Sequence, residues 1–276
     1  MPIPEHDTYL FDLRGYIKLQ GALSSDEVDE LNAAIDTIPR LEPSEWFGYI
    51  NGHSYGDGTS GINYQQIYEA GEPFERLIDH PAWIEHVKTF VGGKGTFDYH
   101  HGPLFIDENF VNFREPGEAI GLHSGNHAGI QRNRFQVVNG RFMCGQVNVL
   151  MALTDIGPGD GGTMVIPGSH KQNFAPPDFD DHRMRENASV DGLDYAEEVH
   201  LNAGDAIVFV DALSHGSAKR VNSGTRRTCV YRYGPSWGNF RHGYEPSSEL
   251  LERLTPERRQ IVHPQKKLQR EPQISP

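Results

Sequence analysis

The stretch from Arg141 to Thr154, RFMCGQVNVLMALT, carries the clearest strand pattern in the chain. Alternate residues of a β-strand point to opposite faces of its sheet. From Met143 onward, one face of this stretch is purely apolar, which is typical of a protein core. The other face places Gln146 and Asn148 among apolar groups, which suits the lumen of a barrel that holds a polar ligand.

The segments before and after this stretch predict further helices and strands. Pro39 ends a helical pattern that begins after a capping box at Ser24, and a second helix is predicted over 81–91. Helices at the front followed by dispersed strands predict a mainly β fold with peripheral helices, built on a double-stranded β-helix of the jelly-roll or cupin-like kind. Besides 141–154, runs rich in β-branched and aromatic residues predict strands at 15–19, 95–100, 109–114, 163–166, 205–210 and 226–233.

The length of 276 residues favours one domain with appendages. We expect an N-terminal helical part over about 1–94 and a jelly-roll core over about 95–245. The polar stretch 176–198 is interpreted as a lid-like insertion, and 263–276 as a flexible tail.

The composition, 37% hydrophobic and 10% aromatic, is that of a globular protein. The net charge of −13 argues against binding to a nucleic acid polymer. Cys144 and Cys229 lie in apolar runs and are expected to be buried thiols. No signal peptide or membrane span is recognisable, so a cytoplasmic protein that does not bind membranes is expected. The sequence leaves the oligomeric state open.

Two histidines lie in segments that suggest a metal site. His123 begins the tripeptide His-Ser-Gly, and His215 follows 92 residues later. Iron(II) that activates oxygen is typically held by two histidines and one carboxylate, with open positions opposite. The tripeptide has the form of a His-X-Asp motif in which Gly125 replaces the aspartate. His127 and Asp160 are alternative sources of a third ligand.

Several motifs in the same order resemble the phytanoyl-CoA dioxygenase family. They are YLFDLRGY at 9–16, LTD at 153–155, GGT at 161–163, IPGSH at 166–170, and Gly204-Asp205 before His215 with an arginine 11 residues later. The resemblance covers most of the chain. It implies a double-stranded β-helix, iron(II), 2-oxoglutarate and O2, with His123 and His215 as metal ligands.

Gly125 departs from the family pattern. In halogenases of this group, glycine or alanine at the corresponding position is associated with a chloride ion on the metal. An anion would restore both the charge and the ligand that the missing carboxylate removes. The resemblance therefore implies a halogenase that chlorinates an unactivated C–H bond, with Gly125 at the halide pocket. A hydroxylase or oxidase of a small metabolite is the alternative, and a non-catalytic jelly-roll binding module is the second alternative.

The family spacing favours Arg226 as the residue that binds the distal carboxylate of 2-oxoglutarate, because a guanidinium makes two parallel hydrogen bonds to a carboxylate. Thr228 shares the face of Arg226 on the predicted strand. Arg227 points to the opposite face and is the alternative. Gln146 and Asn148 are further candidate contacts, unless they belong to a satisfied core network.

Segments 119–154 and 212–244 contain no Asp or Glu, although the chain is acidic. Both histidines lie in these segments, so a local positive field that attracts anionic ligands is expected. A small anionic substrate is predicted, such as a nucleotide of the adenylate type, and a small indole-like or amino-acid substrate remains open. The candidate substrate-binding residues are Arg132, Arg134, Phe135, Arg232, Trp237 and Arg241.

Overall fold

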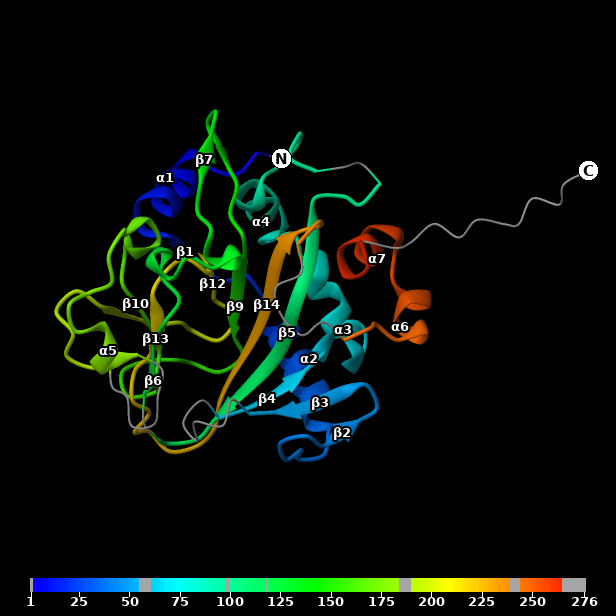
Figure 1. Cartoon of the computed structure of the whole chain (residues 1–276). Helices are drawn as coiled ribbons and strands as arrows, with labels where there is room; N and C mark the ends of the chain where they lie inside the picture. The colour runs from blue at the N-terminus through cyan, green and yellow to red at the C-terminus, as the bar shows by residue number, and fades with distance from the viewer. Residues whose placement is uncertain are drawn as a thin grey trace, which may run out of the picture.

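A computed structural model describes residues 2–54, 61–97, 100–117, 119–183, 190–238 and 244–264. Its described part contains a large and a small antiparallel sheet with helices outside them, as Figure 1 shows. The prediction of a mainly β fold with peripheral helices on a double-stranded β-helix core is confirmed. None of the helices in these ranges is long and apolar enough to cross a bilayer.

The large sheet has eight strands and the small sheet has four, with a separate two-stranded ribbon. In spatial order, the large sheet consists of β1 (Tyr16–Leu19), β12 (Ala206–Val210), β9 (Val147–Ala152), β14 (Arg226–Pro235), β5 (Leu104–Arg114), β4 (Ile62–Gln65), β3 (Ile50–His53) and β2 (Trp46–Phe47). The small sheet consists of β11 (Glu197–Val199), β10 (Thr163–Val165), β13 (His215–Ser217) and β6 (Ile120–His123), and the ribbon of β7 (Val137–Val138) and β8 (Arg141–Phe142).

Several helices pack against the large sheet, and one short helix packs against the small sheet. The α-helices are α1 (Glu5–Arg14), α2 (Ser25–Asp36), α3 (Glu72–Glu75), α4 (Ile84–Val91), α5 (Phe179–His182), α6 (Ser248–Arg253) and α7 (Pro256–Val262). Short 3-10 turns are η1 (Ile67–Ala70), η2 (Arg76–Asp79), η3 (Asn126–Ala128), η4 (Gln131–Asn133) and η5 (Ser169–Lys171). In α4, which packs against β9 and β14, Val87 and Phe90 are fully buried. Burial of these apolar side chains stabilises the packing of α4 against the large sheet.

The start of α2 has the predicted capping box. The Ser24 hydroxyl accepts the backbone N–H of Glu27, and the Glu27 carboxylate accepts the backbone N–H of Ser24 at 2.8 Å. That backbone hydrogen bond is the main reason why the pKa of Glu27 falls to about 2. Local sequence alone therefore determines where this helix begins.

The N-terminal part is less helical than expected, because β1 to β4 all join the large sheet. Of the predicted strand 95–100, residues 95–97 and 100 form turns, since Gly93 and Gly95 adopt positive φ angles of 61° and 92°. The predicted strand 141–154 is also interrupted. A Cβ at Gly145 would lie 2.1 Å from the backbone oxygen of Gln131, and this close backbone approach separates β8 from β9.

The segment 176–198 contributes α5 and the start of β11. Phe179, Leu193 and Ala196 from this segment pack against a small apolar cluster that includes Leu122. Residues 184–189 of this segment, and all but the first two residues of the predicted tail 263–276, lie outside the described residues. Cys144 and Cys229 are buried free thiols, as predicted.

Candidate active site

His123 and His215 lie side by side in the small sheet. His123 ends β6, His215 begins β13, and the two residues are direct partners in the antiparallel pairing. Their ring centroids are 4.1 Å apart. Each Nδ1 faces a backbone oxygen two residues earlier, at 3.1 Å from Gly121 and 2.7 Å from Leu213 respectively. When Nδ1 donates to a carbonyl, Nε2 keeps its lone pair, so both rings are oriented as metal ligands usually are.

The surroundings favour the neutral form of His123. Burial lowers the pKa of His123 well below its ordinary value, and the nearby His215 lowers it further. A metal binds only the deprotonated nitrogen of an imidazole. His123 is therefore held in the protonation state that metal binding requires.

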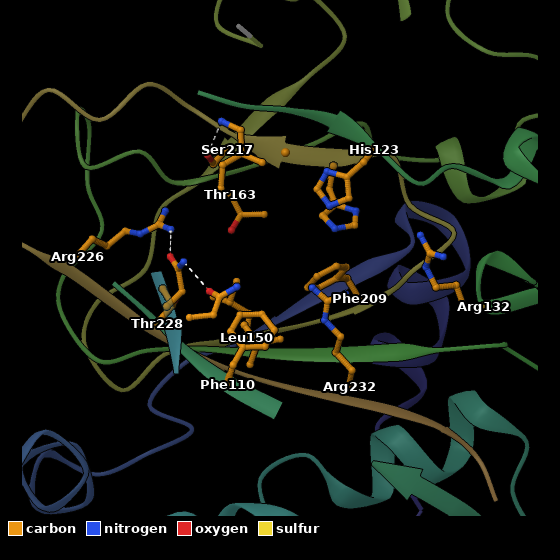
Figure 2. Close-up of a pocket in the computed structure, with 16 residues that line it drawn as sticks. Phe110, His123, Arg132, Leu150, Thr163, Phe209, Ser217, Arg226, Thr228 and Arg232 are labelled. Atoms are coloured by element: carbon orange, nitrogen blue, oxygen red, sulfur yellow. Dashed lines mark hydrogen bonds between the residues drawn. The ribbon is translucent and has the colours of Figure 1, made fainter. Parts of the chain in front are cut away.

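Both histidines line a cavity of about 310 Å³ between the two sheets, drawn in Figure 2. The apolar part of its wall includes Phe110, Leu150, Phe209 and Val230. The described lining residues include three arginines but no Asp or Glu. The lining residues are Asn63, Phe110, Asn112, Ile120, His123, Arg132, Leu150, Thr163, Phe209, His215, Gly216, Ser217, Arg226, Thr228, Val230 and Arg232.

Arg226 is buried at one end of this cavity. Its guanidinium donates to the backbone oxygen of Gly161 and, at 3.1 Å, to Oδ1 of Asn112. Its Nε is buried and has no hydrogen-bond partner in the described structure. Burial, with Arg114 and Arg220 nearby, lowers the pKa of Arg226 to about 9. A buried cation with an unused donor is a suitable partner for a carboxylate ligand.

Three polar residues beside Arg226 were not predicted from the sequence. Ser217 and Thr163 are cross-strand partners in the small sheet, and Asn112 is paired with Thr228 in the large sheet. A signal for Ser217 was available, because it lies two residues after His215 and therefore on the same strand face. Thr228 shares the face of Arg226, as strand alternation predicts, and both residues line the cavity. Together these side chains supply hydroxyl and amide groups around the guanidinium.

Gln146 and Asn148 do not line the cavity. The amide of Gln146 donates to Asp107 at 2.7 Å, and the amide of Asn148 donates to Asp211 at 3.1 Å. They belong to a buried polar network, because carboxylates from other elements satisfy them first. The interpretation of these amides as 2-oxoglutarate contacts is therefore not supported, and Leu150 is the residue of this strand that lines the cavity.

Arg227 lies on the other face of β14, as strand alternation predicts. It donates to Asn32 at 3.0 Å and to Asp36 at 2.7 Å on α2. These partners hold its side chain away from the cavity, so the structure does not support Arg227 as the alternative to Arg226.

The candidate substrate-binding residues separate into distinct places. Arg132 and Arg232 line the cavity. Phe135 packs in the core against Phe11, Phe142 and His170. Arg134 and Trp237 line a separate small recess, and Arg241 lies outside the described residues.

Gly125 lies in the turn between His123 and η3, and it is not among the residues that line the cavity. Its φ of 97° favours glycine. A Cβ there would lie 2.5 Å from Oγ of Ser214 and 2.7 Å from two ring atoms of His127. A residue with a side chain would therefore be strained here, and Ser214 and His127 would have to move to admit it.

The alternative third ligands are engaged elsewhere. Nδ1 of His127 lies 2.6 Å from the amide of Gln172. Asp160 accepts a hydrogen bond from Asn222 at 3.0 Å and lies 4.0 Å from Arg220. Across the described ranges, no group of three or more His, Cys, Asp or Glu residues is arranged to hold a metal ion. The described site thus offers two imidazoles and no protein carboxylate.

The sequence profile of the phytanoyl-CoA dioxygenase family matches residues 11–228. This match covers most of the chain, so the chain belongs to that family and is an enzyme of the iron- and 2-oxoglutarate-dependent oxygenase class. Two relatives of known name are also dioxygenases. Dioxygenase cdmD of Talaromyces verruculosus is 25% identical over 264 residues, covering 90% of this chain and 80% of the relative. The peroxisomal phytanoyl-CoA dioxygenase of Rattus norvegicus is 22% identical over 242 residues, covering 82% and 67%.

Solved structures share the fold. HygX from Streptomyces hygroscopicus, with nickel and 2-oxoglutarate bound, superposes with a TM-score of 0.70 at 22% identity, covering 90% of this chain and 94% of HygX. The 2-oxoglutarate-dependent epimerase SnoN from nogalamycin biosynthesis superposes with a TM-score of 0.57 at 18% identity, covering 83% and 82%. At these identities the likeness is one of fold.

Proposed function

We propose that this enzyme binds iron(II) through His123 and His215 and binds the distal carboxylate of 2-oxoglutarate through Arg226. One observation carries the proposal: the paired histidines and a buried arginine with an unused donor line the same cavity. Thr163, Ser217 and Thr228 add hydroxyl groups beside Arg226. Bound iron would supply oxygen activation, and the chain's own residues orient the cosubstrate and keep the site dry.

We further propose that chloride takes the position of the missing carboxylate and that the enzyme chlorinates an unactivated C–H bond. Two imidazoles without a protein carboxylate leave a cationic site that favours an anion. The balanced reaction converts R–H, chloride, 2-oxoglutarate, O2 and one proton to R–Cl, succinate, CO2 and water. A side chain at Gly125 would be strained and would displace Ser214 and His127, which fits the absence of a carboxylate from this position.

The alternative is a hydroxylase or oxidase of a small metabolite, which the dioxygenase relatives favour. It would need water or another group as the third ligand. Family membership in an enzyme class argues against the non-catalytic binding module.

An anaerobic titration separates these proposals. Iron(II) and 2-oxoglutarate should together give a metal-to-ligand charge-transfer absorption band. Chloride or bromide should shift that band if a halide binds the metal, whereas sodium perchlorate, whose anion coordinates metals only weakly, serves as the ionic-strength control. A band that is unchanged by halides would overturn chlorination and leave hydroxylation, and failure to form any band would overturn the iron and 2-oxoglutarate assignment as well.

Alanine at position 125 should destabilise the protein beyond the cost of backbone strain. A non-glycine residue at positive φ costs about 1–3 kcal/mol, and the contacts with Ser214 and His127 add to that cost. Gly129 is a matched control, because its φ is 66° but nothing lies within 4 Å of an added Cβ. Denaturant unfolding should therefore show a larger loss for Gly125→Ala than for Gly129→Ala. Equal losses would contradict the packing argument.

A further inference from the structure

The cavity has a second cationic side, formed by Arg132 and Arg232. Arg226 and Arg232 lie six positions apart on β14, which is roughly 20 Å along a strand. Figure 2 shows Arg226 on one side of the cavity and Arg132 and Arg232 on the other. Across this separation, one carboxylate of 2-oxoglutarate cannot contact both Arg226 and Arg232. The second side is therefore available to a different ligand.

Both arginines are positioned by acidic residues that do not line the cavity. Nε of Arg132 lies 2.9 Å from Oδ2 of Asp211, and Nε of Arg232 lies 3.3 Å from Oε2 of Glu108. The Arg232 guanidinium also lies over the Phe110 ring, 5.3 Å from its centroid. These contacts orient the two side chains and lower the entropy lost when they bind a ligand.

The wall that joins this side to the histidines is apolar and includes Phe110, Leu150, Phe209 and Val230. Of the two arginines, Arg132 is the more exposed, with 28% of its side chain accessible against 13% for Arg232. A cavity of about 310 Å³ is at the small end of ligand pockets, which span roughly 300–1,000 Å³. If 2-oxoglutarate occupies part of this cavity, the part of the substrate that enters the cavity must be small.

We infer that the substrate carries a carboxylate or phosphate held between Arg132 and Arg232, with an apolar body that extends along Phe209 toward the histidines. This inference rests on the proposed function, since it assigns the Arg226 side to 2-oxoglutarate. The reacting C–H bond belongs to the apolar body, at a distance from the anionic group. A nucleoside monophosphate shares the anionic group of this class, although its sugar and base are polar.

Calorimetric titrations under anaerobic conditions test the inference without turnover. The protein is saturated with manganese(II) and 2-oxoglutarate, which fills the Arg226 side, and is titrated with phenyl phosphate, benzoate or neutral benzamide. We expect the anions to bind and benzamide not to bind. Tight binding of phenyl phosphate alone assigns a phosphate ester, and tight binding of benzoate alone assigns a carboxylate. Adenosine 5′-monophosphate against adenosine applies the same comparison to nucleotides.

Arg132→Gln and Arg232→Gln should each weaken anion binding roughly 10- to 100-fold. Arg134→Gln is the matched control, because Arg134 is a neighbouring arginine that does not line this cavity. The double variant Arg232→Gln with Glu108→Gln removes both charges of the pair and guards against a folding defect. Anion binding that is unchanged in these variants, equal binding of benzamide, or no binding by any anion overturns the inference. Failure to bind manganese(II) or 2-oxoglutarate would instead overturn the proposed function.

Discussion

Replacing His215 with glutamine is expected to abolish iron binding. His215 is one of two imidazoles that the site offers, and its ring is fixed by the 2.7 Å contact between Nδ1 and the backbone oxygen of Leu213. Changing even an outer partner of a metal ligand commonly costs about 10- to 100-fold in affinity, so loss of the ligand itself should exceed that. Equilibrium dialysis against iron(II), with the charge-transfer band in 2-oxoglutarate as a second readout, measures the effect. His123→Gln should behave in the same way.

A buried histidine elsewhere provides the control for folding. His170 is fully buried, faces the backbone oxygen of Asp12 through Nε2 at 3.0 Å, and packs against Phe135 outside the cavity. His170→Gln should therefore lower the free energy of unfolding while stoichiometric iron binding persists. If both cavity variants retained stoichiometric iron, the metal-site assignment would be wrong.

The strands that carry the proposed metal-binding histidines were the hardest elements to predict. β6 and β13 have four and three residues, too few to show an alternating pattern of their own. They are defined by pairing with each other, and β13 pairs with β10 as well, so both strands depend on contacts between distant segments. The histidines themselves were accessible from the sequence because motif spacing, and not strand pattern, identified them.

The polar residues at the start of β9 show the opposite case, in which the local pattern was correct but the structure does not support the role inferred from it. Alternation correctly predicted that polar groups would be buried among apolar ones. It could not show that Asp107 and Asp211, on other segments, would lie beside Gln146 and Asn148. A buried amide binds whichever partner the tertiary fold supplies, and the sequence of one strand does not contain that partner. The orientation of Arg226 and Arg227 was easier to predict, because strand alternation alone places their side chains on opposite faces of the sheet.

Replacing Arg226 with lysine should greatly weaken 2-oxoglutarate binding while leaving iron binding intact. The arginine is 6% exposed and its surroundings are arranged for a planar guanidinium, which donates to Gly161 and Asn112. Lysine keeps the charge but cannot form two parallel hydrogen bonds to one carboxylate. Disrupting a buried charged pair typically costs about 2–5 kcal/mol, on the order of 30- to several thousand-fold in affinity. Titration of 2-oxoglutarate at saturating iron(II), followed through the charge-transfer band, gives the dissociation constant.

Arg227→Lys is the natural comparison, because the two arginines are neighbours on β14 but face opposite sides of the sheet. The Arg227 ion pair with Asp36 lies at the surface, where such pairs contribute about 0–1 kcal/mol. Its replacement should leave the affinity for 2-oxoglutarate unchanged and alter the unfolding midpoint only slightly. Equal loss of 2-oxoglutarate affinity in the two variants would show that the carboxylate is not bound specifically by Arg226. Loss in Arg226→Lys alone would place the cosubstrate opposite Arg132 and Arg232, where the anionic group of the substrate is proposed to bind.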